Sequence, residues 1–374
     1  MIIKFFLYLF SFSHSISISL TQICFGILAL FFLYDLIYKK QFINMDKKII
    51  FLFCLFFLWY SLSVFINYHN LPNLKKLIKE ALGWWHYLIF FVIVFLTYIY
   101  NIDRKKVLYF LYMGGSISAC YGIIQFLEGY GRARGFLTHP LTYGNVIGLI
   151  LIILYVSFLI EKKKTFFFLF LLIGVGFFLS LSRGPIISVI IVMLVFNMLH
   201  YKLRGLIFNL IIVLLLVVIV ISYPPFKNRF SDFVNNSWKN SRSSFGTRLV
   251  LWKASIDIIK DNPIFGIGYN IKREFKHRIK VPVDSMAHSH NSYLTIAVYH
   301  GIPTLIILLM IFIRLLKMFY LSKDIFIRYA GIGVILVYML EGLTEYNFGD
   351  TEVLMLFCFL VGLLYSQIII REKL

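Results

Sequence analysis

The stretch "PLTYGNVIGLILIILYVSFLI", residues 140–160, decides the fold class of this chain. It has no charged residue over a length that can cross a hydrocarbon core of about 30 Å. Because lipid cannot satisfy the hydrogen bonds of a peptide backbone, a run of this kind must be a helix in a bilayer. Similar apolar runs recur through nearly the whole chain, and short charged or Gly/Pro-containing breaks separate them.

The overall composition supports a membrane location. Of the 374 residues, 60% are hydrophobic and 18% are aromatic, and the mean hydropathy is +0.85. These values exceed those of water-soluble domains, so we expect an all-α, polytopic membrane protein in contact with membrane lipids. The formal net charge of +20 does not predict a nucleic-acid partner, because the basic residues punctuate apolar runs and do not gather on a soluble face with stacking aromatics.

The four cysteines each lie inside a predicted span without CxxC spacing, so we expect them to be packing residues. The N-terminal "MIIKFFLYLF" has one lysine before an apolar run but no small-residue cleavage site, which favours a retained first span over a signal peptide. The sequence predicts twelve spans, near residues 4–19, 21–38, 49–66, 81–100, 107–127, 140–160, 165–181, 185–200, 205–222, 291–313, 325–342 and 352–370.

Alternate loops between these spans are rich in Lys and Arg, and the positive-inside rule makes those loops and both termini cytoplasmic. We therefore expect three parts: residues 1–222 with nine spans, an extracytoplasmic loop domain over residues 223–290, and residues 291–374 with three spans.

The loop over residues 223–290 holds 12 Lys/Arg and 5 Asp/Glu, which implies an anionic partner. Within it, "TRLVLWKASIDIIKDNP" (247–263) predicts an amphipathic helix on the membrane surface, with Thr247 as its N-cap and a stop at residues 261–263. Its apolar residues at helical spacing are Leu249, Trp252, Ile256 and Ile259.

On the extracytoplasmic side, arginine or histidine residues stand repeatedly at predicted helix starts. The segments are "RARGFLTHP" (132–140), "SRGP" (182–185), "GTRL" (246–249) and "SHNS" (289–292). A helix N-terminus presents unpaired N–H groups and positive partial charge, and an arginine fork binds phosphate in a bidentate manner. If these helix starts converge, they form an anion site that fits a diphosphate.

Each of these residues also has a simpler interpretation. Arg183 could extend to lipid head groups, Arg132 and Arg134 could be solvated loop residues, and His290 could only cap a helix. The acidic residues after the eleventh span (Glu341, Glu345 and Asp350) are either helix-end charges or acceptor contacts, and the sequence favours helix-end charges.

His288 and His290 could instead be two metal ligands, since residues i and i+2 of an extended segment point the same way. Asp284 is nearby, but no third ligand stands at a recognisable spacing, so we expect no metal and no other cofactor.

The segment from His290 onward resembles the signature of the O-antigen ligase and polymerase superfamily of membrane glycosyltransferases. That signature is His followed by Asn, Ser or Gln, nine residues, and then G-x-x-G at the end of a large periplasmic loop. Here His290 and Asn291 precede residues 292–300 and "GIPT", in which Thr304 replaces the final glycine. Supporting matches are "RGFLTHP" (134–140), "SRG" (182–184), "GTRLVLW" (246–252) and "NPIFGIGYN" (262–270).

The resemblance implies transfer of a glycan from an undecaprenyl diphosphate donor at the periplasmic face of a bacterial inner membrane. The resemblance also implies that no metal or nucleotide is needed, and attack from the face opposite the leaving diphosphate would invert the anomeric carbon. For a ligase the acceptor is a lipid A-core sugar. By motif, Arg183 and Arg248 would hold the diphosphate and His290 would be the catalytic base. Further candidates beside them are Arg134, His139, His288 and Asn291.

Other functions remain open at this point. An O-antigen or exopolysaccharide polymerase uses the same donor with a second lipid-linked glycan as acceptor, and a protein O-oligosaccharyltransferase belongs to the same superfamily. A transporter would place paired charges inside its spans and show inverted repeats, and the sequence shows neither. A purely structural membrane protein has no need of arginines at so many helix starts on one side.

Overall fold

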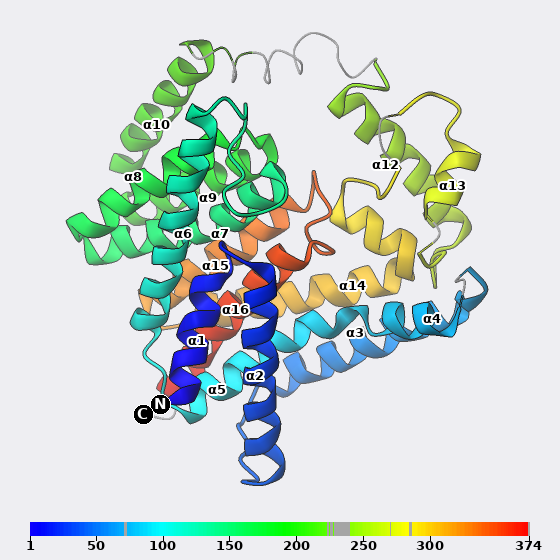
Figure 1. Cartoon of the computed structure of the whole chain (residues 1–374), viewed down its shortest axis with the longest axis horizontal. Coiled ribbons are helices and arrows are strands. Elements are labelled where there is room, and N and C mark those ends of the chain that lie inside the picture. The colour runs from blue at the N-terminus through cyan, green and yellow to red at the C-terminus, as the bar shows by residue number, and fades with distance from the viewer. Residues whose placement is uncertain are drawn as a thin grey trace.

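A computed structural model describes residues 1–70, 73–222, 224, 227, 240–269, 271–283 and 286–372. Over these ranges the chain is helical and has no strand, which confirms the all-α class (Figure 1). The α-helices are α1 (Ile2–Ser13), α2 (Ile18–Ile37), α3 (Lys47–Ile66), α4 (Leu74–Ala81), α5 (Leu88–Ile99), α6 (Arg104–Leu127), α7 (Pro140–Glu161), α8 (Lys164–Leu179), α9 (Arg183–Tyr201), α10 (Leu203–Ser222), α12 (Ser244–Asp261), α13 (Ile271–Arg278), α14 (Ser292–Leu321), α15 (Ile325–Glu341) and α16 (Thr351–Glu372). Two short 3-10 helices are η1 (Tyr68–Asn70) and η2 (Gly83–Tyr87).

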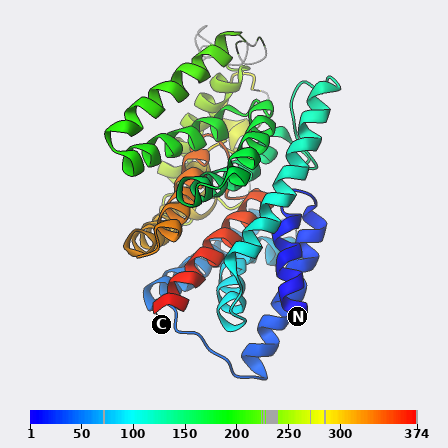
Figure 2. The same cartoon turned by 90° about the vertical axis from the view of Figure 1, so that its left-hand side faces the viewer.

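Among the described residues, 8 segments are long and apolar enough to cross a membrane, so the chain is a polytopic membrane protein. Each span expected from the sequence coincides with a helix, but the count of twelve is not confirmed. The helices α1 and α8 are apolar yet shorter than a full crossing. Both termini lie at the end of the bundle away from α12 (Figures 1 and 2).

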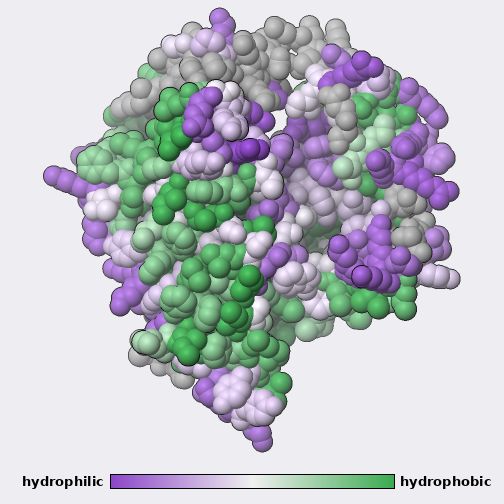
Figure 3. All heavy atoms as spheres, viewed as in Figure 1, coloured by the Kyte–Doolittle hydropathy of each residue, from purple (hydrophilic) through white to green (hydrophobic). Residues whose placement is uncertain are grey.

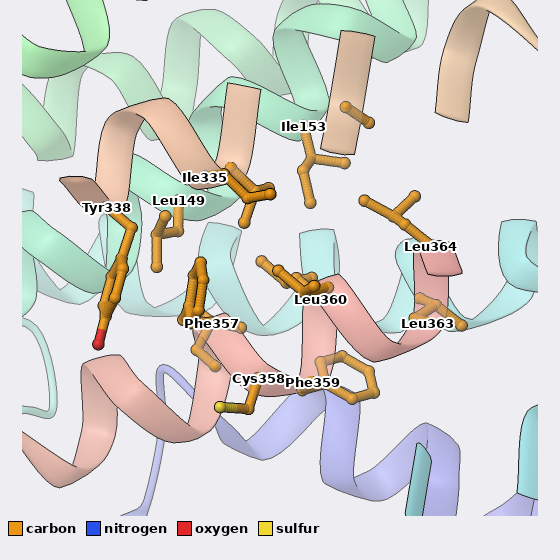
Figure 4. Packing of buried hydrophobic residues seen from close by; sticks show 14 of the residues in the cluster. Leu149, Ile153, Ile335, Tyr338, Phe357, Cys358, Phe359, Leu360, Leu363 and Leu364 are labelled. Carbon is orange, nitrogen blue, oxygen red and sulfur yellow. The ribbon is translucent and has the colours of Figure 1, made fainter. Parts of the chain in front are cut away.

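The centre of the bundle is formed by α7, which contains the stretch 140–160, and by α16. In an apolar stretch of 18 residues, 89% of the residues of α7 and 83% of those of α16 are buried, against 28% in α2. The helix α16 packs against α5, α7 and α15, and Tyr338 of α15 stacks on Phe357 of α16 with ring centroids 3.9 Å apart (Figure 4). The uncharged stretch is therefore a core helix shielded by protein on most sides.

All four cysteines are free thiols. Cys24 and Cys358 are buried, as expected for packing residues, whereas Cys54 and Cys120 are exposed on the bundle surface. The expectation of packing is therefore wrong for Cys54 and Cys120, because their helix faces point out of the bundle.

The helix α14 lies along α3 and is interrupted at Gly301, whose φ is 83°. The loop before α13 provides hydrogen-bond donors to carbonyls next to this break. The N–H groups of Ile267 and Gly268 donate to the carbonyls of Val298 and Tyr299 at 2.8 and 3.0 Å. At Thr304, which replaces the family glycine, the buried hydroxyl donates to the His300 carbonyl at 2.8 Å. The threonine is thus satisfied within its own helix.

The predicted amphipathic helix exists as α12, and its stop at Asp261 is confirmed. The expectation that Thr247 is its N-cap is wrong, because α12 starts one turn earlier, where the Ser243 hydroxyl accepts the Gly246 N–H at 3.0 Å. The opposite face, with Leu251 and Ile258, is fully buried against the protein. The predicted apolar stripe faces outward, with Ile256 45% exposed.

Candidate active site

The helix starts singled out in the sequence converge on one cavity of about 550 Å³. The first residues of α7, α9 and α12 line it, together with the segment before α14 and the loop between α15 and α16. Its polar lining residues are Arg132, His139, Ser182, Arg183, Ser244, Arg248, His290, Thr344 and Glu345, and its apolar ones include Leu141, Ile187, Phe245 and Trp252. Pro140 occupies the first position of α7, as expected from the sequence.

Two arginines meet at one hydroxyl in this cavity. Ser244 Oγ accepts a hydrogen bond from Arg248 Nη1 at 2.6 Å and another from Arg183 Nη2 at 3.3 Å. Arg183 is the first residue of α9, whereas Arg248 lies in the second turn of α12 and not at its start. The two guanidinium groups thus converge on a single oxygen, an arrangement that also suits an oxygen of a phosphate group.

Arg248 is also held from the other side. Its Nε donates to the Thr344 carbonyl at 3.0 Å, and its Nη2 forms an ion pair with Glu345 Oε1. Arg248 is therefore oriented by α12 and by the loop between α15 and α16 together, so its position depends on both elements.

His290 contacts the same carboxylate. Its Nδ1 lies 3.1 Å from Glu345 Oε2, and its backbone adopts the left-handed region with φ of 48°. The side chain is partly exposed to the cavity, at 23%. Glu345 thereby joins the histidine and one arginine of the candidate site.

The Glu345 carboxylate is 7% exposed. Burial alone raises the pKa of a carboxyl group. Here the hydrogen bond from His290 and the positive charge of Arg248 outweigh burial, and the pKa of Glu345 is lowered. Glu345 is therefore anionic at neutral pH and pairs with both residues as a charged acceptor.

The N-terminus of α14 holds this geometry in place. Asn291 is the N-cap, as expected, because its Oδ1 accepts the Leu294 N–H at 3.0 Å while its Nδ2 donates to the Leu343 carbonyl at 3.0 Å. The Ser292 hydroxyl donates to the Glu345 carbonyl at 2.9 Å. The residue after the histidine thus ties the start of α14 to the loop that carries Glu345.

His288 lies beside His290 and outside the cavity lining. The two rings are 4.2 Å apart at their centroids, and His288 Nδ1 accepts the His290 backbone N–H at 3.1 Å. Burial, together with the charges of His290 and Arg248, lowers the pKa of His288 to about 4. The ring is neutral at pH 7 and supports the unusual backbone of His290.

In the segment before α7, His139 and Arg132 line the cavity, whereas Arg134 does not. His139 caps α7 through its Nδ1, which accepts the Leu141 N–H at 3.1 Å, and it lines the cavity. Burial and the nearby Arg132 charge lower its pKa. Arg134 does not line the cavity; its guanidinium lies over the Tyr130 ring at 5.7 Å. Arg132, by contrast, lines the cavity and donates to the Ser180 carbonyl at 2.8 Å.

Within the part of the chain that the structure describes, the histidines of this site do not belong to a cluster of metal-ligating side chains. Over the described ranges, no three His, Cys, Asp or Glu side chains gather closely enough to hold a metal ion. Asp284, the nearby acid in the sequence, lies outside the described residues. The rings of His288 and His290 lie close together and are tilted by 56° to one another.

The sequence interpretation missed two residues of this arrangement. The expectation that Glu345 is a helix-end charge is wrong, because its carboxylate contacts Arg248 and His290, and no sequence pattern indicates Ser244. The pattern that could have identified Glu345 is a lone acid on the same side of the membrane as the His-Asn motif, but sequence alone does not show that the two loops touch.

Part of the chain is similar to a known protein family. Residues 167–309 match the family model described as "O-Antigen ligase". The resemblance to the O-antigen ligase superfamily is thereby confirmed. A Haemophilus influenzae protein described only as uncharacterized is 29% identical over 312 residues, which covers 77% of this chain and 75% of that relative. The family supports a glycosyltransferase of ligase or polymerase type that acts on lipid-linked glycans.

The matched region contains Arg183, Ser244, Arg248 and His290 but ends before Glu345. The cavity is therefore built from the family region and completed by the loop between α15 and α16.

Proposed function

We propose that this chain is an O-antigen ligase that transfers a glycan from undecaprenyl diphosphate to a lipid A-core sugar hydroxyl. The observation that carries the proposal is the contact of His290 with Glu345, which also pairs with Arg248 inside a cavity that Arg183 completes. The reaction runs without metal or nucleotide and inverts the anomeric carbon.

Arg183 and Arg248 bind the donor diphosphate. A phosphate oxygen takes the position between the two guanidinium groups that Ser244 Oγ now occupies, at 3.3 and 2.6 Å from their nitrogens. The helix starts of α7 and α9 add backbone N–H groups and positive partial charge at the same place. Ile187, which is 46% exposed, and Trp252 line the same cavity, so an apolar prenyl chain can leave toward the lipid along them.

His290 is the base. When His290 Nδ1 carries the ring proton and donates a hydrogen bond to Glu345, Nε2 has a free lone pair. This lone pair can take the proton of an acceptor hydroxyl. The hydroxyl oxygen then attacks the anomeric carbon from the face opposite the donor phosphate. The bond between that carbon and the phosphate oxygen breaks, the glycosidic bond forms, and undecaprenyl diphosphate leaves with the electron pair.

The arginines act on the charge that this step creates. The departing diphosphate gains negative charge as the bond breaks, and preorganised cations lower the barrier most where charge develops in the transition state. Glu345 meanwhile stabilises the imidazolium that His290 becomes.

The same proposal assigns the parts of the chain. Residues 1–222 and 291–374 form the membrane bundle, residues 223–290 form the periplasmic loop domain, and both termini are cytoplasmic. The membrane is the bacterial inner membrane, and the cavity opens on its periplasmic side.

Deletion of the gene followed by gel analysis of the cell's glycolipids tests the ligase assignment. A ligase defect removes all long chains from lipid A-core while carrier-linked polymer accumulates. A surviving band with a single repeat on lipid A-core would instead identify a polymerase and overturn the proposal.

A further inference from the structure

The short helix α4 exposes both a lysine face and an apolar stripe. Lys75, Lys76 and Lys79 are exposed, while Leu74 and Ile78 are 69% and 48% exposed. A short helix with a basic face and an exposed apolar stripe lies in the membrane interface, where its lysines meet anionic head groups.

The helix α13 is basic on its outer face. Ile271 and Phe275 are buried against the protein, whereas Lys272, Arg273, Lys276 and Lys280 point to solvent. Arg278 pairs with Asp261 and with Glu274, at 2.7 and 3.5 Å. Over the described residues, the three outward cations of α13, Lys280 just after it and the three lysines of α4 are in no ion pair.

The helices α4 and α13 both lie next to the contact between Tyr60 and Tyr269. The hydroxyl groups of Tyr60 and Tyr269 are hydrogen-bonded, and α13 starts two residues after Tyr269. Gly83, two residues after the end of α4, is so close that an added Cβ would lie 3.5 Å from Tyr269 Oη. Figure 3 shows hydrophilic residues gathered over the α4 and α13 regions of this face.

This basic surface lies at the same end of the bundle as His290. The helices α3 and α14 run side by side, and Asp46, just before α3, pairs with Arg314 near the far end of α14. At the other end, Asn67 Nδ2 donates to the Phe265 carbonyl at 3.1 Å, and Ser63 Oγ lies 2.7 Å from His300 Nδ1. Because α14 starts just after His290, the start of α4 and the candidate base share one end.

The surface formed by α4 and α13 is separate from the arginine cavity. His300 is ten positions further along α14 than His290, which corresponds to about 15 Å of helix. The cavity lining comes from α7, α9, α12 and the loop between α15 and α16, and it includes no residue of α3, α4 or α13. The arginine cavity therefore leaves the surface formed by α4 and α13 free for a second lipid.

We propose that α4 and α13 form an acceptor-binding surface, consisting of Lys75, Lys76, Lys79, Lys272, Arg273, Lys276 and Lys280, that binds the phosphate groups of the acceptor glycolipid. The inference rests on the proposed function, since it assigns this surface to the second lipid of the transfer. Charge complementarity argues for this occupant, because exposed lysine and arginine side chains attract the phosphate groups of a lipid.

The test measures lipid binding without turnover. Protein carrying His290→Ala is purified in detergent, and its Kd is measured for bisphosphorylated lipid A and for the same lipid after removal of both phosphates. Two variants are compared on this background: Lys75→Gln/Lys76→Gln/Lys79→Gln in α4, and Lys272→Gln/Arg273→Gln/Lys276→Gln in α13. The matched control is Lys47→Gln/Lys48→Gln/Lys317→Gln, which removes three exposed charges at the opposite end of α3 and α14.

We expect each surface variant to raise the Kd for bisphosphorylated lipid A by at least about tenfold. The control should keep the parental Kd, and the dephosphorylated lipid should bind weakly and equally to all proteins. Unchanged binding in both surface variants, or an equal loss in the control, would overturn the proposal. Equal competition by phosphatidylglycerol would overturn it too, since the surface would then bind anionic lipid in general.

Activity separates this inference from the proposed function. With His290 intact, the surface variants should raise KM for the acceptor and leave KM for the donor unchanged. If the wild-type chain transfers glycan but the surface variants keep its acceptor KM, the acceptor-binding surface is wrong and the ligase stands. If phosphate-dependent lipid A binding is lost in the variants but the wild type transfers nothing, the ligase is wrong and the binding surface stands.

Discussion

Glu345 Oε2 lies 3.1 Å from His290 Nδ1, although the two residues are 55 positions apart in the chain. The other oxygen of the same carboxylate pairs with Arg248. One buried acid therefore orients the proposed base and one arm of the proposed diphosphate clamp. A change at Glu345 should affect both, and a change at either partner should leave a buried carboxylate with only one contact.

Substitution of the base should abolish transfer. In His290→Ala the acceptor hydroxyl loses its proton acceptor, and general-base catalysis contributes about 10²–10⁴-fold. We expect kcat in a reconstituted transfer assay to fall by that range, while the yield of folded protein is retained. His200→Ala, at the far end of α9, is the matched control, and a His290→Ala enzyme with normal turnover would disprove the assignment.

Glu345→Gln should reduce kcat by roughly 10²-fold, because a neutral amide no longer stabilises an imidazolium on His290. Glu128→Gln changes an exposed acid at the end of α6 and should have no effect. Equal rates for the two variants would show that Glu345 does not position the base.

The same variant should alter stability in a pH-dependent way. Because the pKa of Glu345 is lowered in the folded protein, its contribution is present above the unfolded value of about 4.3. That contribution is lost as the pH falls through the folded pKa. We expect Glu345→Gln to melt at a lower temperature than the wild type at pH 7, with the difference shrinking below about pH 4. A constant difference across this range would contradict the pairing.

The arginines should differ from lysines at the same positions. Arg183→Lys and Arg248→Lys keep the charge but lose the fork that reaches a shared phosphate oxygen, so we expect the donor KM to rise about tenfold or more. Arg134→Lys is the control, since Arg134 lies over the Tyr130 ring and outside the cavity. A donor KM that moves as much in Arg134→Lys would rule out a specific clamp.

Gly301→Ala should destabilise the protein. Gly301 has φ of 83°, and an added Cβ would lie 1.9 Å from the Ile264 carbonyl oxygen. Backbone strain of this kind costs about 1–3 kcal/mol, and the overlap adds to it. Gly174→Ala in α8, where no atom lies within 4 Å of the added Cβ, is the control. Melting temperatures in detergent should fall only for Gly301→Ala.

Asp350 should make stability depend on pH in the opposite direction from Glu345. Thr142 Oγ1 donates to its Oδ2 at 2.7 Å, and burial raises the pKa of Asp350 to about 7. The folded chain therefore holds a proton that the unfolded chain releases near pH 4, and stability falls as the pH rises from about 4 to about 7. Asp350→Asn should remove this slope and melt higher than the wild type at pH 8. An unchanged slope between pH 4 and 7 would contradict the raised pKa.

Local sequence was sufficient for the local elements of the site. Asn291 caps α14 because an Asn before an apolar run can accept an N–H of the first turn. Pro140 starts α7 for a similarly local reason, since its ring fixes a helical φ and its missing N–H has no partner in the first turn. Thr247 shows the limit of this reasoning, because Ser243 can cap the helix equally well one turn earlier. In the structure Ser243 is the N-cap, and the Thr247 hydroxyl donates to the Ser241 carbonyl instead.

What the sequence by itself determined is the helical membrane fold, the motif around His290 and the presence of arginines near helix starts, because periodicity, capping and charge act over a few residues. Only the tertiary structure decided that Ser244 lies between Arg183 and Arg248 and that Glu345 joins Arg248 to His290. Those contacts depend on how α9, α12, α14 and the loop after α15 pack together. Such packing is a sum of many weak contacts between distant segments that no local pattern encodes.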